Sequence, residues 1–136
     1  MKDEEIKDTL NRFKTVAVVG ISPKKDRPSY IVAAYLKSKG YRIIPVRPEG
    51  KEILGEKVYP SLMEIPKEIE IDVVDIFRKS EDAPPVVDEA IRRKAKVVWM
   101  QEGVINKEAG TKAEKAGLKV VMDRCMKKEH QRLLGQ

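Results

Sequence analysis

The sequence has a single cysteine, Cys125, and a single histidine, His130. One cysteine cannot form an internal disulfide, which fits a reducing compartment. Every histidine-based catalytic triad or metal site would have to use His130, and apart from Cys125 no second His or Cys lies at a metal-ligand spacing from it. We therefore expect no metal site, and we expect His130 to lie on the surface.

Long apolar runs and aromatic residues are also scarce. The longest apolar run, residues 16–19, is far shorter than the ~20 residues that span a membrane. Residues 1–5 include acids where a signal peptide would carry basic residues followed by an apolar run. One Trp, four Tyr and two Phe, spread through the chain, offer no stacking platform for nucleic acid. The sequence thus predicts a cytoplasmic protein and disfavours binding to membranes or nucleic acid.

Acidic residues are fewer than basic ones, at 22 against 28, which gives a formal net charge of +6. This excess suggests an anionic partner. Nucleic acid, anionic lipid and a phosphorylated small molecule are all anionic, so charge by itself does not choose among them. The high content of Lys and Glu is also typical of thermophilic proteins. A length of 136 residues fits one domain, residues 1–136.

Short β-branched runs alternate with amphipathic segments along the whole chain, which predicts an α/β fold with a mainly parallel sheet. The expected strands span residues 15–19, 41–46, 71–77, 95–100 and 118–122, with a short additional strand at 57–59. The expected helices span residues 3–12, 29–39, 84–91, 107–116 and 126–134, with a helical turn at 61–64. Because strand-helix-strand crossovers are right-handed, five or six such strands form a Rossmann-like doubly wound sheet. Pro45 is expected to end the pairing of its strand.

In such a sheet, ligands bind beyond the carboxyl ends of the strands, where strand order reverses. The loop after the first strand, residues 20–29, keeps only the first glycine of the dinucleotide fingerprint, because Ser22 and Lys25 replace the others. It leads into a helix amino terminus, which attracts anions. Its cations and hydroxyls suit a phosphate: Lys24, Lys25, Arg27, Ser22 and Ser29. The loop is either a phosphate-binding loop or a solvated surface loop.

The end of the second strand carries Arg47, flanked by Pro45, Val46 and Pro48. An NAD site would have an acid there to hold the ribose hydroxyls. A guanidinium pairs with phosphate through two parallel hydrogen bonds, which suits a phosphorylated ribose. NADP and coenzyme A, whose adenosine bears a 3′-phosphate, are both ligands of this type. The prolines and Val46 would offer an apolar surface to a purine, while the alternative is a simply solvated arginine.

Nine short motifs occur in order between Phe13 and His130: VVGISP at 18–23, RPSY at 27–30, GY at 40–41, IPVRP at 44–48, ILG at 53–55, YPSL at 59–62, VDIFR at 74–78, WMQEG at 99–103 and MDRC at 122–125. Together they resemble the single-domain CoA-binding proteins, a family similar to the CoA-binding domain of the succinyl-CoA synthetase alpha subunit. Each motif is weak alone, whereas nine in register are specific.

The resemblance implies a Rossmann-like domain with coenzyme A as its cofactor. It implies that the loop from Gly20 to Lys25 approaches the CoA phosphates and that residues 45–48 flank the adenosine. Residues 77–78 and 101–103 would border the pantetheine arm. The family usually has asparagine where this chain has Arg47. The binding residues predicted from the loops and the resemblance are Gly20, Ile21, Ser22, Pro23, Lys24, Lys25, Arg27, Ser29, Pro45, Val46, Arg47, Pro48, Phe77, Arg78, Gln101, Glu102 and Gly103.

Cys125 follows the last strand and therefore lies at a carboxyl end of the sheet. Neighbouring Arg124, Lys127 and Lys128 and a following helix amino terminus would favour its thiolate. It is predicted to form a mixed disulfide with the CoA thiol, and the alternative is a small buried packing residue. Asp75, inside a strand pattern, is expected at most to order a neighbouring loop.

The predicted function is a stand-alone module that binds CoA or an acyl-CoA, without catalytic residues of its own. The phosphohistidine of the synthetase lies in a second domain, which this chain lacks, so independent thiokinase activity is not expected. The alternative is a subunit of a thioester or nucleotide-dependent enzyme whose partner chain supplies the catalytic groups. Self-association into a homo-oligomer is a further alternative.

Overall fold

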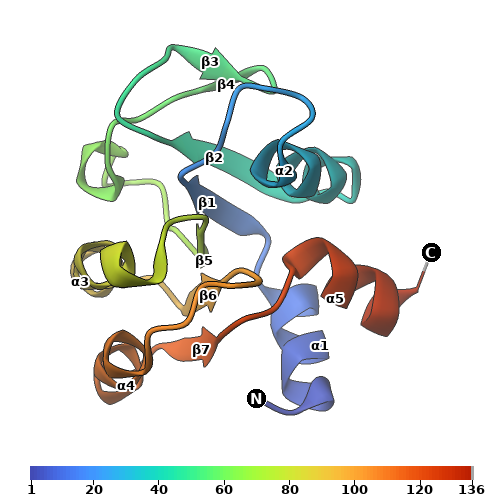
Figure 1. Ribbon diagram of the computed structural model, residues 1–136, viewed down its shortest axis with the longest axis vertical. Coiled ribbons are helices and arrows are strands. Elements are labelled where there is room, and N and C mark those ends of the chain that lie inside the picture. The colour runs from blue at the N-terminus through green and yellow to red at the C-terminus, as the bar shows by residue number, and fades with distance from the viewer. Residues whose placement is uncertain (136) are drawn as a thin grey trace.

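Five parallel strands form the central sheet of the computed structural model, which describes residues 1–135 (Figure 1). Their order across the sheet is β2-β1-β5-β6-β7. The strands are β1 (Thr15–Val19), β2 (Arg42–Val46), β5 (Val73–Ile76), β6 (Val97–Met100) and β7 (Lys119–Val121). The α/β class and the mainly parallel Rossmann-like sheet are thereby confirmed. The order reverses between β1 and β5, so the switch point lies there.

Helices cover both faces of the sheet (Figure 1). One face packs against α3 (Ala83–Arg92) and α4 (Lys107–Lys115), and the other against α1 (Asp3–Arg12), α2 (Pro28–Ser38) and α5 (Met126–Leu134). Along β1, the side chains of Val16 and Val18 pack on the face covered by α1, α2 and α5, and those of Ala17 and Val19 pack on the face covered by α3 and α4. The strand is apolar on both sides because both sides are buried. In the described residues, no helix is long and apolar enough to cross a membrane.

The helix boundaries follow local chemistry that is visible in the sequence. The side chain of Asn106 accepts a hydrogen bond from Ala109 N at 3.0 Å and so caps α4. A short 3-10 turn, η2 (Ser80–Asp82), precedes α3, whose prolines lie in its first turn where no amide hydrogen is needed. These starts agree with the sequence prediction.

Pro45 does not end the pairing of β2, so that expectation is wrong. The register pairs Val18 with Pro45 and Val19 with Val46. Pro45 O accepts from Tyr59 N at 3.0 Å on the outer edge of the sheet. Because the N–H and C=O of one strand residue point to the same side, the missing donor of Pro45 also faces that outer edge. The bond ladder with β1 therefore continues past the proline.

The segment after β2 contains a hairpin that the sequence analysis did not predict. Its strands β3 (Glu52–Ile53) and β4 (Glu56–Lys57) are antiparallel, and Leu54 and Gly55 form the turn with φ values of 56° and 74°. Such a turn needs positive φ at both positions, and leucine at the first one hid the signal. The strand expected at 57–59 is thus displaced to 56–57, and Tyr59 makes only an isolated bridge to Val46.

Arg93, at the end of α3, holds the irregular segment that includes the 3-10 turn η1 (Leu62–Glu64). Its guanidinium donates to the carbonyl oxygens of Leu62, Ile65, Pro66 and Ile69, the last three at 2.8, 3.1 and 3.2 Å. A segment without a regular ladder must find other donors for its carbonyl groups. One fork-shaped side chain meets this need for four of them.

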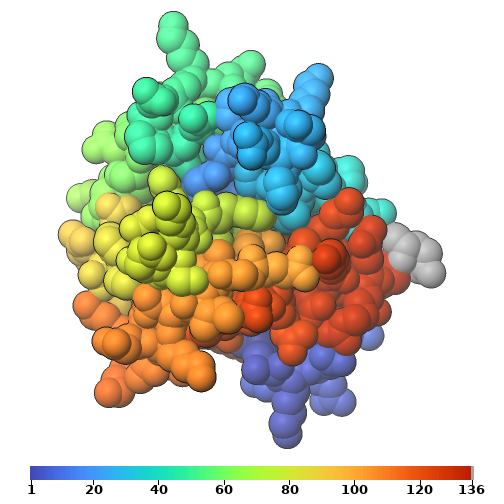
Figure 2. Space-filling view, in the orientation of Figure 1, coloured from blue at the N-terminus to red at the C-terminus, as the bar shows by residue number. Residues whose placement is uncertain are grey.

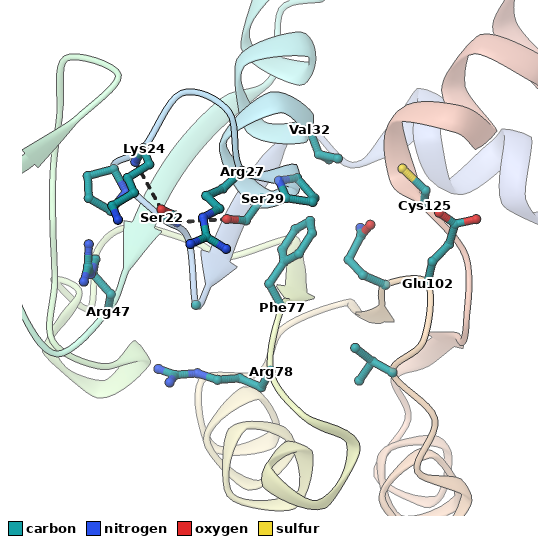
Figure 3. Close-up of a pocket in the computed structure, with 15 residues that line it drawn as sticks. Ser22, Lys24, Arg27, Ser29, Val32, Arg47, Phe77, Arg78, Glu102 and Cys125 are labelled. Atoms are coloured by element: carbon teal, nitrogen blue, oxygen red, sulfur yellow. Dashed lines mark hydrogen bonds between the residues drawn. The ribbon is translucent and has the colours of Figure 1, made fainter.

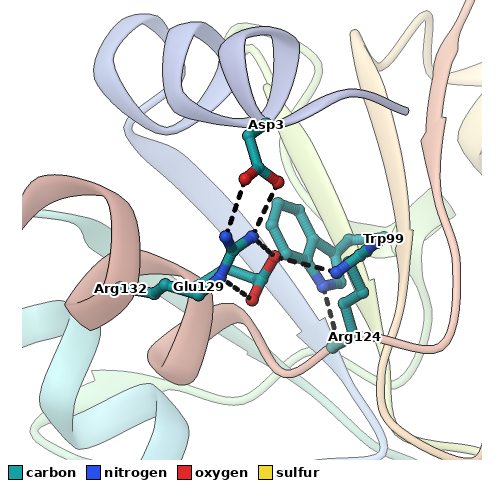
Figure 4. Close-up of polar contacts among 5 residues, drawn as sticks. All are labelled: Asp3, Trp99, Arg124, Glu129 and Arg132. Carbon is teal, nitrogen blue, oxygen red and sulfur yellow. Dashed lines mark hydrogen bonds and ion pairs between the residues drawn. The ribbon is translucent and has the colours of Figure 1, made fainter.

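The carboxyl-terminal helix α5 packs against α1 (Figure 2), and ion pairs join the two helices (Figure 4). Arg132 bonds both oxygens of Asp3, at 2.8 and 2.9 Å, and also Glu129 at 2.7 Å. Glu129 is buried, and its Oε1 also forms an ion pair with the guanidinium of Arg124 at 3.3 Å. Part of the basic charge in this segment is thus paired with acids, so it is not free to attract an external anion.

His130 is buried, with 7% of its surface exposed, so the expectation of a surface residue is wrong. Its Nδ1 shares a hydrogen bond of 2.7 Å with the hydroxyl of Tyr35, and the rings of Tyr35 and Tyr41 contact it edge-on. Burial lowers the pKa of His130, and the positive charges of Lys14 and Lys39 lower it further. The residue is part of the packing between α5 and α2.

Replacing Arg93 with alanine is expected to lower the free energy of unfolding by about 2–4 kcal/mol, because it leaves several carbonyl oxygens without donors. Urea denaturation measures this loss. The neighbouring Arg92, which is exposed, provides a matched control. Arg92→Ala should change stability by no more than about 0.5 kcal/mol. Equal effects of the two substitutions would contradict the role of Arg93.

Candidate functional site

A pocket of about 730 Å³ opens at the carboxyl ends of the strands, beside the switch point between β1 and β5 (Figure 3). This volume lies within the range of small-molecule and cofactor sites. Twelve predicted binding or thiol-contact residues line it: Gly20, Ser22, Pro23, Lys24, Arg27, Ser29, Arg47, Phe77, Arg78, Gln101, Glu102 and Cys125. They come from five separate segments, one after each strand, which the parallel sheet brings together at the carboxyl ends of its strands.

Three lining residues were missed, and six predicted ones lie outside the wall. Pro28, Val32 and Val104 line the pocket although the sequence analysis did not select them. The signal for Val32 was available, since it lies one turn into a helix that leaves the site. Not in the wall are Ile21, Lys25, Pro45, Val46, Pro48 and Gly103. Ile21, Pro45 and Val46 are buried, and the involvement of all six in binding stays a prediction.

Gly20 joins the ends of three strands. Its N–H donates to Val46 O at 2.9 Å, and its φ is +90°. A Cβ at this position would lie 2.1 Å from the carbonyl oxygen of Phe77. Only glycine permits this approach, which explains why the chain keeps the first glycine of the fingerprint. The two residues that follow these contacts, Arg47 and Arg78, are therefore placed at the same edge.

The serine hydroxyls order the loop that follows Gly20. Ser29 Oγ accepts from Ser22 N at 2.9 Å, and Ser22 Oγ accepts from Lys24 N at 3.1 Å. Each hydroxyl accepts in these bonds, so its own proton remains available to a ligand. These bonds give the loop a defined shape, and both serines line the pocket.

Three arginines surround one end of the pocket. Arg27 precedes α2, Arg47 follows β2 and Arg78 follows β5, and Figure 3 shows their side chains around one common space. Within residues 1–135, none of them forms a salt bridge with an acid. Neighbouring like charges repel, and an anion between them would remove this cost. This end of the pocket therefore suits phosphate groups.

The other end of the pocket contains Cys125 and Glu102 (Figure 3). Cys125 is the N-cap residue of α5, and 9% of its surface is exposed. It is thus a mostly buried side chain that also contacts the pocket, so the two alternatives for this residue are compatible. Glu102 is paired with Nζ of Lys128 at 3.0 and 3.2 Å. This ion pair connects the loop that follows β6 to helix α5, close to the thiol of Cys125.

Asp75 is a completely buried acid on β5. Its Oδ1 accepts from Gln101 Nε2 at 2.5 Å, and its Oδ2 has no partner. Burial raises the pKa of Asp75 to about 7, although the bond from Gln101 opposes the shift. The expectation that Asp75 would at most order a neighbouring loop agrees with this contact, because Gln101 is the first residue of the loop after β6, and Gln101 also lines the pocket. An acid among β-branched strand residues was the available signal.

A doubly wound parallel sheet with a cation-lined pocket at its switch point defines the class of Rossmann-like ligand-binding proteins. Residues 14–131 match the family described as "CoA binding domain". The chain belongs to this family. No group of three or more His, Cys, Asp or Glu in the described residues is arranged to hold a metal ion.

Relatives of the chain differ greatly in length. It is 44% identical over 126 residues to the uncharacterized protein YneT of Bacillus subtilis, covering 93% of this chain and 92% of that protein. A hypothetical protein from Pyrococcus horikoshii superimposes with a TM-score of 0.95 and 47% identity, over 99% of this chain and 94% of that one. The alpha subunit of the ADP-forming acetate–CoA ligase I of Pyrococcus furiosus is 35% identical over 97 residues. These cover 67% of this chain but 21% of that subunit.

The raised pKa of Asp75 predicts a specific pH dependence of stability. The folded state holds the proton more tightly than the unfolded state, so this contribution is complete below about pH 4 and is lost as the pH rises to about 7. Asp75→Asn cannot ionise and should lack this loss. Relative to the variant, the wild-type free energy of unfolding should fall by up to about 1.4 kcal/mol per pH unit in this range. Urea denaturation of both proteins from pH 4 to 8.5 checks it, and parallel curves would contradict it.

Proposed function

We propose that this chain is a stand-alone module that binds coenzyme A or an acyl-CoA. The observation that carries the proposal is the difference between the two ends of the pocket: Arg27, Arg47 and Arg78, which have no acidic partner within residues 1–135, lie at one end, and Cys125 lies at the other. Coenzyme A has the same polarity, with three phosphate groups at one end and a thiol at the other. The family match and the names of the related CoA ligases support the same ligand.

In this proposal each part of coenzyme A contacts pocket residues of complementary chemistry. Arg47 pairs with the 3′-phosphate, as a guanidinium does best through two parallel bonds. The loop from Gly20 and the amino terminus of α2 receive the diphosphate. The pantetheine arm then runs along Phe77 and Gln101 toward the thiol of Cys125.

A second function is favoured by the similarity to the alpha subunit of an acetate–CoA ligase. The chain spans only 12–21% of three of the related ligases, so the remainder of such an enzyme would come from a partner chain. The sole histidine, His130, is buried and hydrogen-bonded to Tyr35, so this chain offers no exposed imidazole for phosphoryl transfer. A CoA-binding subunit would therefore still bind its ligand alone, although it would not catalyse acyl-CoA synthesis.

Calorimetric titration with CoA, dephospho-CoA, NADP and NAD tests the ligand. We expect CoA to bind roughly 10–100-fold more tightly than dephospho-CoA, which is the effect of losing a charge-assisted hydrogen-bonded pair. Arg47→Ala should abolish most of this preference. Arg42→Ala is the matched control, because Arg42 is an exposed residue at the opposite end of the same strand. Equal affinity for all four ligands, or for none, would refute the proposal.

Cys125 is proposed to exchange with CoA disulfide. Its thiolate attacks one sulfur, forms the protein–CoA mixed disulfide and releases one CoA thiolate, so no other oxidant is needed. Intact mass should show one CoA adduct that dithiothreitol removes and that is absent in Cys125→Ser. Oxidised glutathione, which lacks the nucleotide, should react much more slowly. Equal reaction with both disulfides would show that the pocket does not guide the exchange.

A further inference from the structure

Asp75 lies next to the pocket, and the proposed function leaves it without a role. It occupies the centre of the sheet, paired with Val18 of β1 and Trp99 of β6, and its side chain is fully buried. In residues 1–135 its Oδ2 is the only buried side-chain nitrogen or oxygen without a hydrogen-bond partner. Such an atom in a packed interior is costly and calls for an explanation.

Gln101 connects this acid to the pocket. The residue follows β6, lines the pocket and is only 3% exposed. Its Nε2 donates to Asp75 Oδ1 at 2.5 Å. In the part of the chain that the structure describes, its Oε1 has no protein donor and is not among the buried unpartnered atoms. The carbonyl oxygen of Gln101 therefore retains access to the space of the pocket.

The contact with Asp75 decides which end of the Gln101 amide a ligand meets. The two ends of a glutamine amide are almost equal in shape but opposite in hydrogen bonding. An ionised carboxylate only accepts hydrogen bonds. Asp75 therefore attracts the NH₂ end inward, which leaves the acceptor end facing outward. Without the acid, either end would be free to face the pocket.

We propose that Asp75 is a positioning residue that orients Gln101 so that the pocket presents a hydrogen-bond acceptor to an N–H group of the ligand. The assignment rests on the proposed function in one respect, since the matching donor is then a secondary amide N–H of the pantetheine arm. The phosphate groups bind at the arginine end, so the effect of Asp75 is confined to the arm.

The test compares CoA with adenosine 3′-phosphate 5′-diphosphate, which lacks the arm, at a pH above the pKa of Asp75. The ratio of the two affinities measures the contribution of the arm. Asp75→Asn and Gln101→Met should each lower this ratio roughly tenfold, while the affinity for the armless nucleotide changes less than twofold. The double variant should be no worse than Gln101→Met, because Asp75 acts through Gln101.

Asp72→Asn is the matched control. Asp72 precedes the same strand. Its carboxylate accepts hydrogen bonds from Lys14 N and Thr15 N at the amino ends of the strands, away from the pocket. This variant should leave the ratio unchanged. A purely structural effect of Asp75→Asn would instead weaken both ligands equally, which would overturn the proposal. A double variant with additive losses would overturn it too.

A measurement on the wild-type protein keeps the proposal testable if Asp75→Asn does not fold. In isotope-labelled protein, a scalar coupling through the hydrogen bond should link Gln101 Nε2 with Asp75 Cγ. Absence of this coupling would overturn the orientation of Gln101, whether or not CoA binds. If the wild-type protein binds neither nucleotide, the proposed function fails, while the coupling still decides the orientation.

Discussion

The close approach of the chain at Gly20 is the constraint on which the site depends. Its N–H bonds to Val46 O, and its α-carbon lies so near the carbonyl of Phe77 that no side chain fits. The ends of β2, β1 and β5 are thus held together at one residue. Arg47 and Arg78 follow these two contacts directly in the chain, so they reach the same space as Arg27. The position of the charges in the pocket is therefore a consequence of backbone packing at the switch point.

The basic side chains of the protein fall into two groups, which differ in whether an acid pairs with them. On α5 and its neighbours, Arg124 and Arg132 are paired with Glu129 and Asp3, and they join the first and last helices. Around the pocket, the arginines have no acidic partner in the described residues. A net charge of +6 says only that an anion would be attracted. The distribution of ion-pair partners shows where the anion would bind, because a cation without an acidic partner gains the most electrostatic stabilisation from an anionic ligand.

Sequence reasoning succeeded where a local pattern has one physical solution. The five strands of the sheet, the helix starts at Pro28 and Asn106, and the loop edge that forms the pocket all follow from periodicity and the crossover rule. It failed where the outcome depends on a distant partner. Pro45 is tolerated within β2 because its missing N–H donor faces the outer edge of the sheet. His130 is buried because the rings of Tyr35 and Tyr41 pack against it.

The sequence by itself determined the fold class, the family resemblance and most of the side chains at the mouth of the pocket, because each is encoded in short contiguous motifs. Only the tertiary structure decided which groups are paired. Gln101 meets Asp75 across 26 positions, and Arg93 reaches carbonyl groups up to 31 positions away. Hydrogen bonds and burial are properties of neighbours in space, and parallel strands bring together residues that lie far apart in the chain.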